Sequence, residues 1–279
     1  MSQRAIRVER AGLQSLIVDR GRFGFRHEGV GWCGAMDPYG FEVANELAGN
    51  APGAAAIEIV LGDVTVVFES PARFALTGAD CAARLDDLPV ANWSSHVART
   101  GSRLVLQRPR AWMRTCLAID GGIDVPLVLG SRTTDLLAKM GGQDGRALRA
   151  GDRLALGAPA AAPHCVAVDP PPLDFVFRTI AQPFADRLWD REWTVGHESN
   201  RMGCRLRGDA RPHDRGSMRS RAVFPGFIQL PPSGEPIVLM SDAQTTGGYP
   251  LAGVVVEADL WKLGQTPLGA KIRFVEQRL

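Results

Sequence analysis

The segment QTTGGYP, Gln244 to Pro250, is the most informative part of this sequence. It follows an apolar run from Ile237 to Met240 that is typical of a buried strand. Its two glycines allow positive φ angles and a close approach of the backbone to a ligand, while Gln, Thr and Tyr supply hydrogen-bond donors and acceptors. The residues alone are consistent both with a binding loop and with an ordinary Gly-Gly hairpin whose polar side chains face water.

A similar pattern occurs in the first half of the chain. The apolar run from Cys116 to Ile119 is followed by Gly121-Gly122-Ile123, and both halves then continue through an apolar run, an Asp-Leu pair and a closing strand. A duplication predicts two β-rich units of the same topology, and chance similarity between turn-rich β sequences is the alternative. At the shared turn, the second copy carries many more polar side chains than the first.

Composition limits the class of protein. A chain of 279 residues with 31 Gly, 19 Pro and 7% aromatic residues favours short strands joined by turns. The net charge of +2 gives no indication of nucleic-acid binding, and the five cysteines and five histidines lack the spacing of a metal site. The first residues lack the apolar region of a signal peptide, and no apolar run approaches a membrane span. We therefore expect a soluble, cytoplasmic protein with no membrane interaction.

Local patterns predict the positions of the elements. Asp37 and Pro38 are typical of a helix start and Gly49 of a helix end, so a helix is expected between them. Strands are expected at 5–9, 13–19, 57–61, 64–68, 73–76, 103–107, 115–119 and 150–156, and shorter helices at 136–140, 184–190 and 258–263. The turn Gly62-Asp63 is expected to join two of these strands. The Ala- and Pro-rich segment 158–172 is expected to link domain 1–157 to domain 173–279.

Seven motifs occur in order along essentially the whole chain: GAMDP (34–38), TGAD (77–80), GGIDVP (121–126), LGSRTTDL (129–136), SNRMGCRLRG (199–208), PGFIQLPPSGEPI (225–237) and DAQTTGGYP (242–250). Together they resemble the allophanate hydrolase subunit 2 family, also called biotin-dependent carboxyltransferase family proteins. This family includes the C component of bacterial 5-oxoprolinase and KipA-type regulators. The resemblance implies a mainly β fold with short helices, arranged as two tandem cyclophilin-like β-barrel domains, which agrees with the duplication.

The resemblance also implies a function. It predicts the C component of an ATP-dependent 5-oxoprolinase, which acts with a subunit 1 partner (KipI-like, the B component) on the lactam of 5-oxoproline to give glutamate. Two alternatives remain: transfer of a carboxyl group from carboxybiotin to urea or a related amide, and non-catalytic regulatory binding in the manner of KipA. The chain has neither a GxxxxGK[ST] loop nor a Met-Lys-Met site for biotin attachment. ATP is therefore expected to be used by the complex, and any carboxybiotin to arrive on another chain.

Both reactions need donors for a developing oxyanion and a group that transfers a proton. The residues predicted to be catalytic are Asp242, Gln244, Tyr249 and Asp80, and those predicted to bind substrate are Arg201, Arg205, Thr245, Thr246, Gly247, Gly248 and Arg132. No metal ligands are predicted.

Three of these predictions depend on an assumed local geometry. The N–H groups of Gly247 and Gly248 are expected to form an anion-binding nest. Arg201 and Arg205 would share a face of a helical turn and clamp a carboxylate or phosphate, and an ordinary surface pair is the alternative. For Arg132 the alternative is an ion pair with Asp135 or a helix cap, and for Asp80 it is an ordinary turn aspartate.

Overall fold

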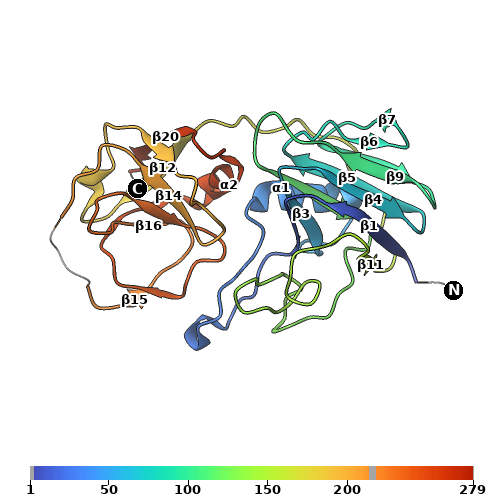
Figure 1. The fold of residues 1–279 in the computed structure, drawn as a ribbon, viewed down its shortest axis with the longest axis horizontal. Coiled ribbons are helices and arrows are strands. Elements are labelled where there is room, and N and C mark those ends of the chain that lie inside the picture. Colours follow the sequence, from blue (N-terminus) through green and yellow to red (C-terminus); the bar gives the residue numbers. More distant parts are fainter. Residues whose placement is uncertain (1–2, 214–217, 279) are drawn as a thin grey trace. The chain divides into compact units, whose positions relative to one another are not determined.

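The computed structural model describes residues 3–213 and 218–278, which form two compact units (Figure 1). Unit 1 contains residues 3–21 and 37–171, and unit 2 contains residues 22–36 and 172–278. These boundaries differ from the expected domains 1–157 and 173–279. Residues 158–171 pack with unit 1, where Ala167 forms a β-bridge with Ser94. Residues 22–36 pack with unit 2, because Met36 is buried in the apolar core of that unit.

Unit 1 consists of two antiparallel sheets and one helix. Its elements are β1 (Ala5–Ala11), β2 (Gln14–Val18), α1 (Pro38–Ala48), β3 (Ala56–Val60), β4 (Val64–Phe68), β5 (Ala72–Gly78), β6 (Arg84–Leu85), β7 (Leu88–Pro89), β8 (Ser94–Ala98), β9 (Arg103–Leu106), β10 (Arg114–Ile119) and β11 (Arg153–Ala155). The described strands have the orders β11-β1-β4-β9-β6-β7 and β2-β3-β10-β5-β8. The core contains side chains from both sheets, and the rings of Phe68 and Phe74 lie 5.3 Å apart.

Helix α1 begins and ends where the sequence predicts. The carboxylate of Asp37 accepts a hydrogen bond from the Gly40 N–H at 2.7 Å, which satisfies one of the free amides of the first turn. Gly49 ends the helix with φ of 79°, a conformation that glycine adopts without steric cost.

Two local expectations for unit 1 are wrong. Strands β3 and β4 do not form a hairpin, because Leu61, Gly62 and Asp63 all have positive φ and turn the chain from one sheet into the other. Residues 136–140 form turns rather than a helix. Asp135 and Met140 exchange two backbone hydrogen bonds of 2.9 and 3.1 Å, which close this segment into a loop.

Unit 2 contains a closed barrel of seven described strands in the order β12-β19-β16-β17-β14-β13-β20. Its elements are η1 (Arg26–Glu28), β12 (Val176–Ala181), η2 (Ala185–Arg187), β13 (Trp193–Val195), β14 (Gly203–Arg207), β15 (Arg221–Ala222), β16 (Phe227–Gln229), β17 (Ile237–Leu239), β18 (Thr246–Gly247), β19 (Leu251–Val255), α2 (Glu257–Gln265) and β20 (Lys271–Glu276). The short β15 and β18 pair with each other outside the barrel. The helix expected at 184–190 is only the 3-10 turn η2, whereas the helix expected at 258–263 is present as α2.

Alternation along the strands separates the core of the barrel from its outer surface. In β14, Cys204 and Leu206 are buried in the core, whereas Arg205 and Arg207 are exposed. Ile228 of β16 and Val238 of β17 also lie in that core. Their neighbours along each strand therefore point outward, and three adjacent strands present one outer face of the barrel.

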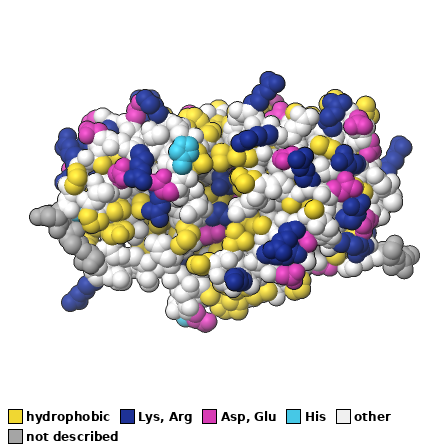
Figure 2. Space-filling view, viewed as in Figure 1, with side chains coloured by type: hydrophobic (Ala, Val, Ile, Leu, Met, Phe, Trp, Pro, Cys, Tyr) yellow, Lys and Arg dark blue, Asp and Glu magenta, His cyan; other side chains and the backbone are white. Residues whose placement is uncertain are grey.

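The fold class expected from the sequence, mainly β with short helices, is confirmed: α1 and α2 are the α-helices of the described residues, and unit 2 is a closed barrel. The described strands of the two units differ in topology: those of unit 1 form two antiparallel sheets, whereas the barrel of unit 2 is closed by β20, which runs parallel to β12. Neither described helix has the length and apolar character that crossing a bilayer requires. On the face shown in Figure 2, the Lys and Arg side chains are interspersed with Asp and Glu.

Candidate functional site

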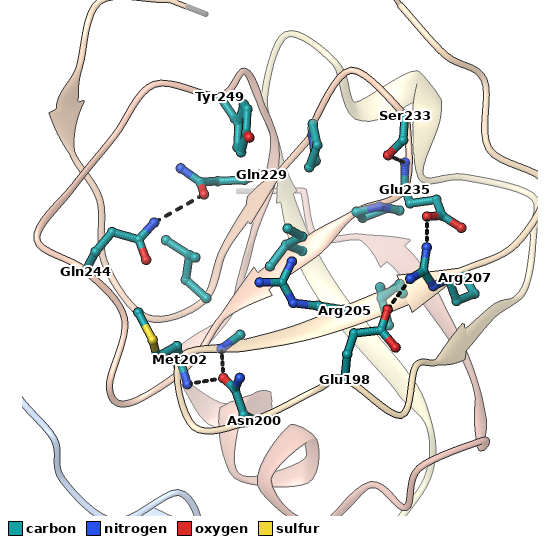
Figure 3. Close-up of a pocket in the computed structure, with 16 residues that line it drawn as sticks. Glu198, Asn200, Met202, Arg205, Arg207, Gln229, Ser233, Glu235, Gln244 and Tyr249 are labelled. Atoms are coloured by element: carbon teal, nitrogen blue, oxygen red, sulfur yellow. Dashed lines mark hydrogen bonds and ion pairs between the residues drawn. The ribbon is translucent and has the colours of Figure 1, made fainter. Parts of the chain in front are cut away.

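A cavity of about 370 Å³ opens on the outer face of β14, β16 and β17 in unit 2 (Figure 3). It is lined by Glu198, Asn200, Met202, Gly203, Arg205, Leu206, Arg207, Gln229, Pro231, Ser233, Glu235, Pro236, Ile237, Leu239, Gln244 and Tyr249. A volume of this size is within the range that small-molecule sites occupy. Three of the predicted site residues, Arg205, Gln244 and Tyr249, meet in this cavity although they come from separate parts of the chain.

Strand register brings the floor of the cavity together. Ile237 of β17 pairs with Arg205 of β14 on one side and with Gln229 of β16 on the other. Since neighbouring strands lie about 4.8 Å apart, Arg205 and Gln229 are separated by roughly 10 Å at their backbones and face the same way. A cationic and an amide side chain therefore flank an apolar floor at a separation that suits a small ligand.

Gln229 is the most buried polar group of the cavity, with 2% of its surface exposed. Its Oε1 accepts a hydrogen bond of 3.5 Å from Gln244 Nε2, while its own Nε2 has no partner among the described residues. A buried donor without an acceptor costs about 1–3 kcal/mol, and native proteins rarely retain one without a purpose. This buried amide packs closely against Gly247 on one side and lies beside Gln244 on the other.

Arg205 is the arginine that remains available to a ligand. Its neighbour Arg207 is held by the carboxylates of Glu198 and Glu235. No hydrogen bond or ion pair of the Arg205 guanidinium occurs within the described part of the chain, and Figure 3 shows this side chain extending toward the middle of the cavity.

Glu198 keeps a negative charge at the edge of the cavity. A hydrogen bond from its own backbone N–H, together with the charges of Arg207 and Arg205, lowers the pKa of its carboxyl group. The cavity is lined by two acidic side chains, Glu198 and Glu235, and by two basic ones, Arg205 and Arg207; both carboxylates pair with Arg207.

The remaining residues of QTTGGYP support the cavity and do not line it. Thr246 and Gly247 form β18, which pairs with Ala222 and Arg221 of β15. Neither Gly247 nor Gly248 has a left-handed φ angle, so the predicted nest is not formed there. Gly247 is needed for another reason: a Cβ atom at this position would lie 2.3 Å from Gln229 Nε2.

Arg201 and Asp242 form a buried ion pair. Asp242 accepts two hydrogen bonds of 2.8 Å from Nε and Nη2 of Arg201, whose side chain is 6% exposed. Arg201 also donates to the Gly34 carbonyl at 2.8 Å. The expectation that Arg201 and Arg205 share a helical face is wrong, because Arg205 lies on the extended strand β14 and Arg201 precedes it in a turn. The geometry gives this ion pair the role of fixing the start of the QTTGGYP loop.

Asp80 and Arg132 belong to unit 1, where each has its own contacts. Asp80 lines a different cavity, of about 730 Å³, and its carboxylate accepts a hydrogen bond from Ala82 N–H at 2.8 Å. Arg132 forms an ion pair of 3.2 Å with Asp124 rather than with Asp135, which instead accepts hydrogen bonds from the amides of the loop that follows it.

Sequence reasoning missed Gln229, Glu198 and Arg207. A signal for Gln229 was present in PGFIQLPP, where one amide side chain interrupts an apolar strand. The two others lie in and beside SNRMGCRLRG, whose alternation predicts a strand with outward-facing arginines. Across the described residues, no group of three or more His, Cys, Asp or Glu side chains is arranged to hold a metal ion.

The chain is similar to known proteins in both sequence and structure. Residues 28–276 match the family model described as "Carboxyltransferase domain, subdomain A and B". The chain is 43% identical to the C component of 5-oxoprolinase from Escherichia coli, over 97% of this chain and 91% of that protein. It is 40% identical to the protein of the same name from Haemophilus influenzae, over 94% and 87% of the two chains. The crystal structure of the K. lactis urea amidolyase superposes with a TM-score of 0.91 at 28% identity, covering all of this chain and 19% of that one.

Proposed function

Since the chain belongs to the family of carboxyltransferase domains, subdomain A and B, we propose that it is the C component of a 5-oxoprolinase. The observation that carries the proposal is the 43% identity to the Escherichia coli protein of that name, which extends over nearly the full length of both chains. The proposed complex is cytoplasmic, contains a KipI-like partner as its B component, and couples ATP hydrolysis to opening of the lactam ring. The nucleotide is a substrate of the complex, and no residue of this chain is assigned to it.

The cavity of unit 2 supports a substrate of this chemical class. 5-Oxoproline carries one carboxylate, one lactam carbonyl and one lactam N–H. The guanidinium of Arg205 is suited to a carboxylate because it can donate two parallel hydrogen bonds. The amide side chains of Gln229 and Gln244, which line the same cavity, are suited to the lactam group. Arg205 and Gln229 flank Ile237, so a five-membered ring would lie against its apolar side chain.

Gln244 and Tyr249 complete the proposed site. Gln244 lies beside Gln229 in the cavity, where its Nε2 donates to Gln229 Oε1 at 3.5 Å. Tyr249 is 40% exposed at the rim, where its hydroxyl can donate or accept a hydrogen bond with the substrate. Preorganised donors of this kind stabilise the negative charge that develops on a carbonyl oxygen under attack.

The test is an assay of the complete complex. The chain is purified together with its partner subunits, and glutamate formation from 5-oxoproline is measured with and without ATP. We expect ATP-dependent glutamate formation. A complex that contains every component and forms no glutamate would contradict the proposal.

A second candidate function is carboxyl transfer to urea or a related amide. It is favoured by the family description and by the TM-score of 0.91 against the K. lactis urea amidolyase structure, although the chain spans only 19% of that protein. Supplying carboxylated biotin carrier and urea to the same complex separates the two functions. Urea carboxylation without glutamate formation would favour the second, and partner binding without either reaction would favour a regulatory role.

A further inference from the structure

We propose that residues 22–36, here called the strap, hold the QTTGGYP loop in its binding conformation, and that Arg26 positions Gln244. The strap precedes α1 in sequence but packs with unit 2. The catalytic consequence rests on the proposed function, whereas the effect of the strap on the loop does not. Arg26 does not line the cavity, so its proposed role is positioning rather than catalysis.

The guanidinium of Arg26 connects two segments that flank the site. Its Nη2 donates to the backbone carbonyl of Val223, next to β15. The same nitrogen lies 3.3 Å from the carbonyl oxygen of Gln244 and 3.4 Å from that of Thr245. The amide of Val223 in turn donates to the Thr245 carbonyl at 3.1 Å. One side chain therefore fixes the backbone from which Gln244 reaches Gln229.

Two aromatic rings enclose this guanidinium. The Cζ atom of Arg26 lies 5.1 Å from the ring centre of Trp32 and 4.7 Å from that of Phe224. Trp32 and Phe224 also contact each other, with ring centres 5.7 Å apart. Burial among these groups lowers the pKa of Arg26, and its Nη1 has no hydrogen-bond partner among the described residues. Cation–π attraction holds a cation in such a place, although burial opposes its charge.

The other end of the strap holds the start of the same loop. Cys33 N–H donates to the Ser241 carbonyl at 3.1 Å, and the Ser241 hydroxyl donates to the Ala35 carbonyl at 3.1 Å. Arg201, paired with Asp242, donates to Gly34. The strap therefore contacts the loop at Ser241 and again at Gln244 and Thr245, so both points of attachment precede the glycines.

Loss of the Arg26 contacts has a defined consequence. The backbone at Gln244 and Thr245 would lose its bonds to the guanidinium, and Gln244 would fix the amide of Gln229 less strongly. Polar groups held to within a fraction of an ångström are what a catalytic site requires, so the effect should be on turnover more than on overall folding.

The first experiment measures the loop directly in the full-length chain, without reference to activity. Hydrogen–deuterium exchange of peptides covering residues 240–249 is compared between wild type, Arg26→Ala and Arg191→Ala. Arg191 is a matched control in unit 2, because it also lies over a tryptophan ring, at 5.9 Å from Trp193, and donates to a carbonyl, that of Asp209. We expect at least tenfold faster exchange in these peptides for Arg26→Ala alone. Equal exchange in all three proteins would overturn the inference.

The second experiment measures turnover of the complete complex. We expect Arg26→Ala to lower kcat at least tenfold while KM changes less than threefold, and guanidinium ion added at millimolar concentration to restore part of the loss. Arg26→Lys should recover little, because an ammonium group does not reproduce the planar set of donors. Unchanged kcat in an active complex would overturn the positioning role. If the wild-type complex has no 5-oxoprolinase activity, but Arg26→Ala still speeds hydrogen–deuterium exchange of the loop, only the proposed function is contradicted.

Discussion

At the scale of single residues, Gln229 and its neighbours form one side of the cavity. Its amide is buried, is held on one side by Gln244 and is unpaired on the other. Glycine at position 247 leaves room for it, since the nearest atom to an added Cβ is Gln229 Nε2 at 2.3 Å. The identity of Gly247 therefore follows from a neighbouring side chain and not from a backbone angle.

Gly247→Ala tests this arrangement. The added methyl group should displace the Gln229 amide and lower kcat/KM at least tenfold. The melting temperature should change little, because the atom displaced is the end of a flexible side chain. Steady-state kinetics of the complex measure kcat/KM, and a thermal melt measures the melting temperature. In Gly247→Ala/Gln229→Ala the loss should be no larger than in Gln229→Ala alone, and additive losses would contradict the steric explanation.

Arg205 provides the residue-scale test of substrate charge. Hydrogen bonds to a charged group contribute about 1.5–3 kcal/mol, so Arg205→Ala should raise KM for 5-oxoproline by roughly 10- to 150-fold. Arg205→Lys keeps the charge but not the two parallel donors, and should give an intermediate KM. An uncharged substrate analogue that lacks the carboxylate should show no difference among the three proteins. An unchanged KM in Arg205→Ala would show that Arg205 does not bind the carboxylate of the substrate.

At the scale of elements, α2 is joined to β12 by a charged side chain. Asp259 of α2 is 1% exposed and accepts hydrogen bonds from Arg178 N–H at 2.9 Å, Nε at 3.0 Å and Nη2 at 2.8 Å. Burial by itself would raise the pKa of this carboxyl group, but the hydrogen bonds from Arg178 and the charge of Lys262 outweigh burial and lower it. The interaction therefore stabilises the folded state only while Asp259 is ionised.

Asp259→Asn should consequently have a pH-dependent effect on stability. A carboxyl group whose folded pKa lies below its ordinary value of 3.8 stabilises the protein above that value, and the contribution is lost as the pH falls through the folded pKa. We expect a loss of about 1–2 kcal/mol in the free energy of unfolding at pH 7 that shrinks below about pH 4. Urea denaturation of wild type and Asp259→Asn at several pH values measures this difference in the free energy of unfolding.

The matched control for that substitution is Asp174→Asn. Asp174 also contacts Lys262, at 2.8 Å, but its side chain is 60% exposed. Exposed ion pairs contribute little, so its substitution should change the free energy of unfolding by less than about 1 kcal/mol. A loss for Asp259→Asn that stays constant between pH 7 and pH 3 would contradict the role assigned to the ionised carboxylate.

At the scale of the whole molecule, the chain enters unit 2 twice. It leaves unit 1 after residue 21, contributes the strap and Met36 to unit 2, returns to form α1, and enters unit 2 again at residue 172. The stability of the barrel therefore depends on residues that lie far from it in sequence and directly before a helix of the other unit.

Met36→Ala tests whether the stability of unit 2 depends on this early segment of the chain. Truncation of a buried Met costs about 2–5 kcal/mol, and we expect the loss in unit 2, where Met36 is 3% exposed in the core. Hydrogen–deuterium exchange should become faster in β14 and β17 and stay unchanged in β3 and β10. Leu117→Ala, a fully buried residue of the unit 1 core, should give the opposite pattern. Faster exchange of β3 and β10 in Met36→Ala would contradict the assignment of this residue.

The sequence by itself determined the features that depend on short windows of residues. Asp37, Pro38 and Gly49 predicted the bounds of α1, since helix ends are fixed by caps within a few residues. Short apolar runs predicted most strands of unit 1. The motifs predicted the family, and they contain Arg205, Gln244 and Tyr249, which line one cavity in the structure.

Only the tertiary structure decided which side chains meet. The pairing of Ile237 with both Arg205 and Gln229 is a matter of strand register, and register has no signature within any one strand. The ion pair of Arg201 with Asp242 and the packing of the strap on unit 2 are likewise contacts between residues distant in sequence. Such contacts are selected by burial and hydrogen bonding in the assembled fold, because the local chain has no means of favouring one distant partner over another.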